Sequence, residues 1–136
     1  MPDVLALMRD WLDAVAMGPA EAWTALSSDE VVIRLPYAPP GVAAELRGRT
    51  AAVAALTPVW RAKERFAWRD VRILRTEEPG LLLATARSEA AYFSGKSYAN
   101  TYVILTRFLD GQVIEHVEYF NPLPVMALFG EAGEAS

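Results

Sequence analysis

The sequence predicts an α+β fold in which N-terminal helices pack on a curved, mainly antiparallel sheet that encloses a pocket. Three observations support this prediction. In the first 60 residues apolar side chains recur every three or four positions, which is the spacing of a helix face. From Phe66 onward, strand-like runs alternate with turn residues. Helices followed by strands are typical of the α+β class, in which the helices cover one face of the sheet.

Two helices are expected before the first strand. Asp3 can cap the first helix, and Gly18-Pro19 is a pair that stops one. The expected buried stripe of this helix is Leu5, Met8, Leu12 and Val15. Pro19 suits the first turn of a short second helix that carries Trp23. Residues 31–35 then read as a short strand, which a proline closes.

A loop and a third helix follow. Residues 36–47 contain three prolines and a glycine, so no regular element is expected there. This loop could form a rim over a pocket or be a plain connector. Thr50 is expected to cap a third helix, in which Pro58 should cause a kink or a restart. The expected buried stripe of that helix is Val53, Leu56 and Trp60, and Lys63 to Arg65 should end the segment with positive charge, as the helix dipole prefers.

The second half reads as antiparallel strands. The apolar alternation that begins at Phe66 shifts phase, and a β-bulge near Asp70 would explain the shift. Residues 77–80 form a turn, and residues 81–93 the next strand. A short apolar helix over residues 123–129, with a frayed tail from residue 130, is expected to end the chain.

Residues 98–122 are predicted to form a hairpin with its turn at Asp110-Gly111, because such a tight turn needs positive φ at both central residues. Counting outward pairs Leu105 with His116 and Val103 with Glu118. Since side chains alternate, these pairs share one sheet face. The other face would then carry the apolar set Tyr102, Ile104, Phe108, Val113, Val117 and Tyr119.

Composition narrows the class of protein. The 136 residues suit one domain, 1–136, and at 53% hydrophobic and 22% charged the chain can build a real core. A net charge of −4 without a basic cluster argues against a nucleic-acid partner. The lack of cysteine excludes disulfides and thiolate metal sites and favours a reducing cytoplasm. A single histidine excludes a histidine-rich zinc site, and the apolar runs are too short to span a membrane.

Several segments resemble a known superfamily. They are PYAPPG, the RGR that opens the third helix, YANTY and DGQVIEHVEYFNP. The chain resembles the nuclear transport factor 2-like, cystatin-like α+β cones, and within them the SnoaL-like polyketide cyclases and phenazine-biosynthesis A/B proteins. The resemblance implies that the last strand lines a pocket. It also implies that His116 points inward and that Glu118 acts as a general acid or base.

The chain departs from other branches of that superfamily. The steroid-isomerase branch uses an aspartate near the end of the first strand, but IRLPYA holds no carboxylate, so steroid isomerisation is not expected. The helical-side histidine of phenazine A/B-like proteins is also missing. Arg107 could serve in an epoxide-hydrolase-like site, but that site needs a pair of buried carboxylates that is not evident.

Glu118 and His116 are the expected catalytic pair. A carboxylate enclosed by apolar walls loses hydration, which suits it to exchange protons near neutral pH. The alternative is a structural ion pair with Arg34 or Arg107. His116 lies about 6.5–7 Å along the strand from Glu118, so it can contact the carboxylate or be a satisfied core residue. As an imidazolium it would hold Glu118 ionised, and as a neutral ring it would orient a ligand.

The expected pocket wall combines aromatic side chains with the sheet neighbours of this pair. Stacking on a flat ligand is one role for the aromatic members, and plain core packing is the other. The predicted wall is Tyr37, Arg34, Trp60, Trp68, Val103, Leu105, Arg107, Phe120 and Trp11.

The residues favour a small-molecule enzyme without metal or organic cofactor. It would catalyse an isomerase-, cyclase-, condensation- or dehydration-type reaction on a flat, largely apolar metabolite. The alternative is a non-catalytic binding protein for a hydrophobic small molecule. A purely structural role would be indicated by the lack of a cavity above about 300 Å³. The apolar second face of the sheet predicts a homodimer that buries on the order of 1,500 Å².

Overall fold

The computed structural model describes residues 3–135, with four helices and six strands in that range. In chain order they are α1 (Val4–Met17), α2 (Ala20–Leu26), β1 (Ser27–Arg34), β2 (Glu45–Arg47), α3 (Arg49–Ala62), β3 (Lys63–Arg75), β4 (Leu81–Tyr92), β5 (Ser97–Leu109), β6 (Gln112–Phe120) and α4 (Pro122–Ala135). The last helix runs past the expected end at residue 129.

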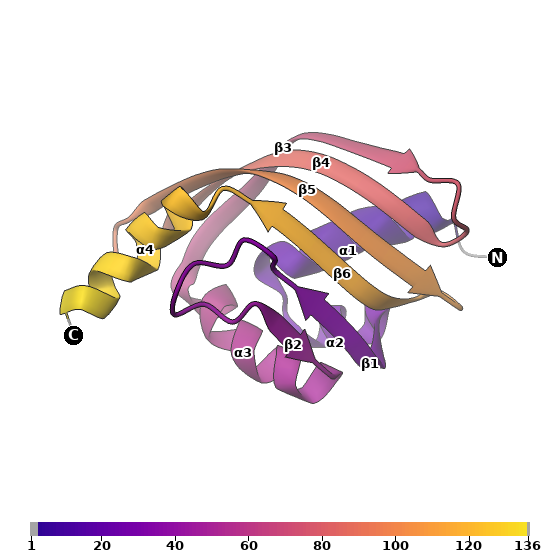
Figure 1. The fold of residues 1–136 in the computed structure, drawn as a ribbon, viewed down its shortest axis with the longest axis horizontal. Helices are drawn as coiled ribbons and strands as arrows, with labels where there is room; N and C mark the ends of the chain where they lie inside the picture. The colour runs from indigo at the N-terminus through magenta and orange to yellow at the C-terminus, as the bar shows by residue number, and fades with distance from the viewer. Residues whose placement is uncertain (1–2, 136) are drawn as a thin grey trace.

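The six strands form one curved sheet in the order β2-β1-β6-β5-β4-β3. The β1–β6 pair is parallel and the other pairs are antiparallel. In Figure 1, α1 runs along the concave side, α2 and α3 lie beside β1 and β2, and α4 covers the end of the sheet away from the N-terminus. The α+β cone expected from the sequence is therefore confirmed. None of the described helices is long and apolar enough to cross a membrane.

The expected cap of α1 is confirmed, whereas the expected cap of α3 is wrong. The Asp3 carboxylate accepts a hydrogen bond from the Leu5 N–H at 3.0 Å, so the expected cap of α1 is present. At the start of α3 the cap is Gly48, not Thr50, because the chain turns there with a φ of 87° that favours glycine. Pro58 sits inside α3, yet the helix continues to Ala62 without a restart.

Two strand features differ from the expectation for residues 36–47 and 63–65. Glu45–Arg47 forms the short edge strand β2, because its backbone pairs with Val32–Arg34 of β1 even though prolines precede it. Lys63 already belongs to β3 rather than to the end of α3. The bulge near Asp70 is confirmed, since Arg69 pairs with Arg87 but Arg72 pairs with Thr85, and Asp70 has a φ of 53°.

The hairpin turn lies at the predicted residues, but the predicted pairing of the two strands beyond the turn is wrong. Asp110 and Gly111 have φ values of 52° and 79°, as the tight turn requires. Phe108 then pairs with Val113, and Arg107 with Glu115, so Ile114 is an extra residue in β6. The bulge shifts every later pair by one position.

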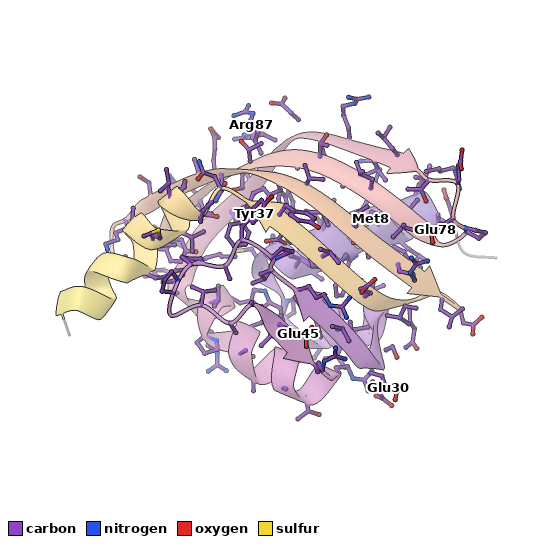
Figure 2. All side chains as sticks on the ribbon, in the orientation of Figure 1. Met8, Glu30, Tyr37, Glu45, Glu78 and Arg87 are labelled. Carbon is purple, nitrogen blue, oxygen red and sulfur yellow. The ribbon has the colours of Figure 1, made fainter. Side chains whose placement is uncertain are left out.

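This shift corrects the expected assignment of faces on β5. His116 pairs with Thr106 and Glu118 pairs with Ile104, not with Leu105 and Val103. Tyr102, Ile104, Phe108 and Val113, expected on the outer face, are instead buried in the core. Only Val117 and Tyr119 of the expected outer set stay on that face. Figure 2 shows polar side chains, among them Arg87, projecting from the convex side.

Candidate active site

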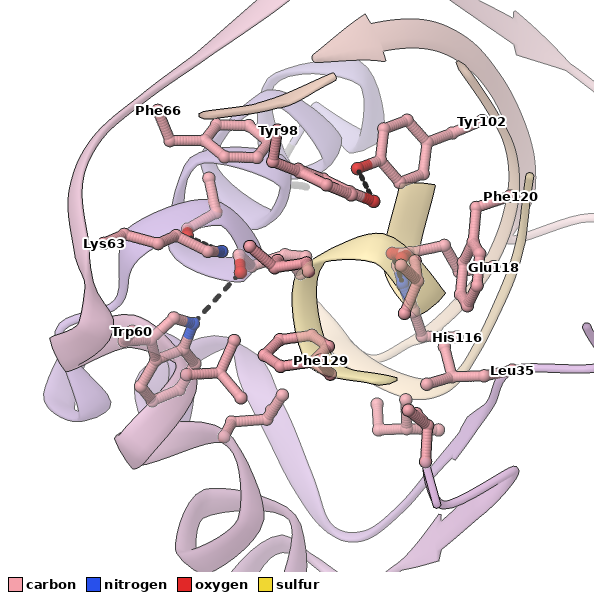
Figure 3. A pocket seen from close by; sticks show the side chains of 18 of the residues that line it. Leu35, Trp60, Lys63, Phe66, Tyr98, Tyr102, His116, Glu118, Phe120 and Phe129 are labelled. Carbon is pink, nitrogen blue, oxygen red and sulfur yellow. Dashed lines mark hydrogen bonds and ion pairs between the residues drawn. The ribbon is translucent and has the colours of Figure 1, made fainter. Parts of the chain in front are cut away.

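A cavity of about 190 Å³ lies between the concave face of the sheet and the helices. Its wall is mostly apolar and aromatic, and it includes residues of α3, α4 and the loop that follows β1 (Figure 3). Leu35 and Val42 of this loop line it together with Leu46 of β2, so the loop does contribute a rim. Two charged side chains reach this wall, Lys63 and Glu118.

The size of the cavity limits what it can hold. Ligand sites for drug-sized molecules start at about 300 Å³, whereas an apolar cavity of about 150 Å³ accommodates benzene. The cavity is smaller than the lower limit of about 300 Å³ expected for a ligand site, and its volume of about 190 Å³ suits only a molecule with a single ring. A larger hollow of about 510 Å³ lies over β3, β4 and β5, but neither His116 nor Glu118 lines it.

His116 and Glu118 of β6 are joined inside this cavity. His116 Nε2 and Glu118 Oε1 are 3.0 Å apart, and the histidine is only 2% exposed. Behind the ring, Trp11 of α1 donates its indole N–H to His116 Nδ1 at 3.0 Å. The Thr106 hydroxyl on the paired strand lies 3.3 Å from the same nitrogen.

The Trp11 hydrogen bond determines which nitrogen of His116 carries the hydrogen. An indole N–H can only donate, so Nδ1 must accept with its lone pair. A neutral imidazole then carries its hydrogen on Nε2, which donates to Glu118 Oε1. A doubly protonated ring would set a second N–H against the indole, so the contact selects the neutral ring. Of the two ring forms considered from the sequence, the geometry favours the neutral one, but its Nε2 is directed at Glu118 rather than at a ligand.

The carboxylate of Glu118 is held at one oxygen and open at the other. His116 is the one hydrogen-bond partner of this carboxylate within residues 3–135, and it contacts Oε1. The Glu118 side chain is 16% exposed, and it lines the cavity. Oε2 is therefore available to a molecule in the cavity.

A chain of hydroxyl groups lies beside this carboxylate. Tyr102 donates to the Tyr98 oxygen at 3.0 Å, and the Asn100 amide donates to the same oxygen at 2.7 Å. The Ser88 hydroxyl lies 2.9 Å from that of Tyr102. The Tyr98 oxygen thus accepts two hydrogen bonds, and no acceptor for its own hydrogen lies among the described residues. Because Tyr98 lines the cavity, this hydrogen is available to a ligand.

Burial keeps both phenols protonated. It raises the pKa of Tyr98 and that of Tyr102, and the charge of Glu118 nearby raises both further. At neutral pH the two hydroxyls are therefore donors rather than phenolates. They extend the polar side of the cavity that begins at His116.

The structure places five of the predicted wall and catalytic residues around the cavity: Trp60, Trp68, His116, Glu118 and Phe120. The Trp60 indole donates to the Val15 carbonyl at 3.0 Å, and the Trp68 indole to the Leu12 carbonyl at 2.9 Å, so α1 fixes both rings. Trp11 lies behind His116 and is completely buried, rather than lining the cavity.

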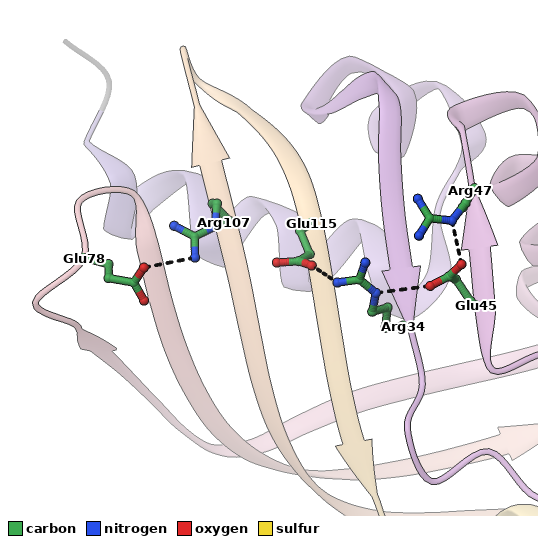
Figure 4. Close-up of polar contacts among 6 residues, drawn as sticks. All are labelled: Arg34, Glu45, Arg47, Glu78, Arg107 and Glu115. Atoms are coloured by element: carbon green, nitrogen blue, oxygen red, sulfur yellow. Dashed lines mark hydrogen bonds and ion pairs between the residues drawn. The ribbon is translucent and has the colours of Figure 1, made fainter.

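The other predicted wall residues face away from the cavity. Val103 is 40% exposed, and Leu105 and Arg107 lie on the same outer face, because the extra residue in β6 reverses the expected pairing. Arg107 forms an ion pair with Glu78 at 3.3 Å (Figure 4). Arg107 therefore does not pair with Glu118.

Arg34 and Tyr37 also point outward. Arg34 pairs with Glu45 at 3.2 Å and with Glu115, on the side of β1 opposite the buried Ile33 (Figure 4). Tyr37 is 57% exposed and its ring packs edge-on against Tyr119, 5.4 Å between centroids. The structural ion pairs considered for Glu118 are therefore made by other carboxylates.

Lys63, Tyr98 and Tyr102 are cavity residues that the sequence did not single out as part of the site. From the sequence, Lys63 was expected to lie at the end of the third helix, where a positive charge interacts favourably with the helix dipole. Tyr102 was assigned to the outer face through the unshifted register. The repeated aromatic spacing in YANTY was the available signal. Within residues 3–135, no group of three or more His, Asp or Glu side chains is arranged to hold a metal ion.

The fold and its inward-facing site define a nuclear transport factor 2-like cone. The model of the SnoaL-like domain matches residues 8–116, most of the chain, so the chain belongs to the SnoaL-like family. The resemblance inferred from the sequence segments is thereby confirmed.

Relatives support the same placement. The chain is 29% identical over 120 residues to an uncharacterised PhzA/B-like protein of Pseudomonas aeruginosa, covering 83% of this chain and 80% of that one. A Bacillus subtilis protein provisionally named an isomerase superposes with a TM-score of 0.83 at 20% identity, over 93% and 92% of the two chains. A Δ5-3-ketosteroid isomerase from Mycobacterium sp. gives 0.73 at 20% identity, over 89% and 95%. At these identities the structures establish the fold alone.

Proposed function

We propose that this protein is an isomerase- or cyclase-type enzyme that uses Glu118 for cofactor-free proton transfer on a small molecule. One observation carries the proposal. A carboxylate inside an apolar cavity is held through one oxygen by a neutral histidine, whose own orientation is fixed by Trp11. An acid–base group that is positioned and shielded in this way suits proton transfer to and from carbon.

The proposed mechanism begins with proton abstraction next to a carbonyl. Glu118 Oε2 takes the proton, and the electrons of the broken C–H bond move into the carbonyl to form an enolate. The Tyr98 hydroxyl donates to the oxygen that gains charge. The His116 Nε2–H keeps Glu118 Oε1 in place. Return of the proton to another carbon completes an isomerisation, whereas attack of the enolate carbon on a second carbonyl closes a ring.

A minimal substrate can test the proton transfer without knowledge of the natural one. Cyclohex-3-en-1-one has one ring, which suits the cavity, and a proton shift from carbon 2 to carbon 4 converts it to the conjugated cyclohex-2-en-1-one. We expect the protein to accelerate this conversion above buffer. Glu118→Gln should slow it by roughly 10²–10⁴-fold, the usual contribution of a general base.

Glu115→Gln is the matched control, since Glu115 lies on the same strand and pairs with Arg34 on the outer face. It should keep the wild-type rate. A Glu118→Gln variant as active as wild type would contradict the proposal. Binding of the ring, reported by tryptophan fluorescence, without any conversion would favour the binding-protein alternative.

We also propose a homodimer through the outer face of the sheet. Although four of the residues that first suggested it are buried in the core, that face carries apolar side chains at Leu83, Val103, Leu105, Val117 and Tyr119. A group of neighbouring apolar side chains on an exposed face is typical of a protein–protein contact. Sedimentation should show a dimer at micromolar concentration, and a stable monomer would contradict this proposal.

A further inference from the structure

Lys63 lies across the cavity from the His116–Glu118 pair (Figure 3). It is the first residue of β3 and is half-buried. Its ammonium nitrogen Nζ donates to the Ala16 carbonyl at 2.6 Å and sits 4.9 Å from the centre of the Phe66 ring. None of the ion pairs among the described residues includes Lys63.

The surroundings leave this ammonium group short of partners. An ammonium has three N–H donors, and one of them reaches Ala16. Enclosed cations are normally paired with an anion, because the loss of hydration is costly. A role as a cap for the last turn of α1 would explain one donor but not the position of the group on the cavity wall. Two donors remain for a molecule in the cavity.

We propose that Lys63 binds an anionic oxygen of the ligand and thereby makes this cavity selective for single-ring molecules that carry one negatively charged group. The inference rests on the proposed function only in assigning the opposite side of the cavity to proton transfer. The ring would lie between the aromatic walls, its charged end at Lys63 and its reacting carbon near Glu118. The cavity would discriminate against neutral molecules of the same shape.

The charge of Lys63 is available at neutral pH and is lost in mild base. Burial lowers the pKa of Lys63 to about 8, and the negative charge of Glu118 acts in the opposite direction. The other titratable groups that line the cavity are His116, Tyr92, Tyr98 and Tyr102. Burial raises the pKa of each of these tyrosines, so none of them becomes an anion as Lys63 loses its proton.

Benzoate and benzamide provide a matched pair of probes, because they share shape and differ in charge. Their dissociation constants can be measured by calorimetry and by the fluorescence of the cavity tryptophans. At pH 7 we expect wild type to bind benzoate at least tenfold more tightly than benzamide. The preference should fall about tenfold per pH unit above pH 8, because the free protein then loses the proton on Lys63.

Variants separate this role from a structural one. Lys63→Met should abolish the preference by weakening the binding of benzoate at least tenfold more than that of benzamide, and Lys63→Arg should retain it. Arg65→Met removes the same charge from an exposed position two residues along β3 and should have no effect. If Lys63→Met fails to fold, the pH series on wild type still decides.

Equal binding of the two probes to wild type would overturn the inference, as would a preference that survives in Lys63→Met or that does not fall between pH 8 and pH 9.5. Glu118→Gln serves to separate this inference from the proposed reaction. It removes the base but should keep or increase the preference for benzoate, because a negative charge leaves the cavity. Failure of proton transfer and failure of anion binding therefore give different results.

Discussion

Raising the pH from 7 to 9.5 should stabilise the fold through Lys63. In the unfolded chain this lysine keeps its proton up to its ordinary pKa of 10.5, whereas burial lowers the pKa in the folded protein to about 8. Between these values the unfolded state binds more protons, so the free energy of unfolding rises with pH. The difference of about 2.5 pH units corresponds to about 3 kcal/mol, of which about 2 kcal/mol should be recovered by pH 9.5.

The measurement is urea unfolding of wild type and of Lys63→Met at half-unit steps of pH. Taking the difference between the two proteins cancels the tyrosines, whose titration destabilises the fold above pH 10. Lys63→Met also loses the hydrogen bond to Ala16, but that loss does not depend on pH. The gap between the two curves should shift by about 2 kcal/mol in favour of wild type. Parallel curves would refute the view that Lys63 is a desolvated cation.

Three further predictions follow from the contacts of the site and of one turn. Trp11→Phe removes the donor to His116 Nδ1, so nitrogen NMR should show a mixture of the two neutral ring forms, with a loss of stability on the order of 2 kcal/mol; a single unchanged form would contradict the role of the indole. Tyr98→Phe should slow the conversion of cyclohex-3-en-1-one by roughly 10²-fold, and an unchanged rate would exclude this hydroxyl as the donor. Gly80→Ala should cost at least about 2 kcal/mol more than Gly95→Ala in urea unfolding, since both have positive φ but a Cβ at Gly80 would lie 2.5 Å from the Phe108 carbonyl oxygen; equal losses would contradict this.

Local signals in the sequence were sufficient to predict most of the helices and strands and the hairpin turn, but not the edge strand β2. Asp3, Gly18-Pro19 and Asp110-Gly111 each impose a backbone geometry that no distant contact has to supply. The bulge at Asp70 could be predicted because the apolar alternation visibly changes phase there.

The bulge at Ile114, in contrast, could not be recognised in the sequence. The run VIEHVEY contains neither glycine nor proline, and its extra residue is accommodated where β6 lies between β5 and β1. Counting from the turn therefore placed the wrong face of β5 beside His116. Tyr102 was assigned to the outer face and Val103 to the cavity as a result.

The remaining features of the site could not be predicted because they depend on contacts between residues far apart in the sequence. The ring form of His116 depends on Trp11, which lies 105 residues earlier in the chain. Lys63 lies at a further irregularity, the register shift between Lys63 and Arg65 in β3, and its ammonium group contacts the Ala16 carbonyl of α1. Neither can be derived from spacing within one element, because the contacting groups, Trp11 and the Ala16 carbonyl, both belong to α1.

The fate of one transferred hydrogen tests the central claim about Glu118 most directly. Cyclohex-3-en-1-one carrying deuterium at carbon 2 can be converted in ordinary water, and the product examined by NMR for deuterium at carbon 4. If the shielded Glu118 carboxylate carries the proton between the two carbons, a measurable share of the deuterium should appear there, and none should be transferred by Glu118→Gln. A wild-type product with only solvent hydrogen at carbon 4 would contradict the account.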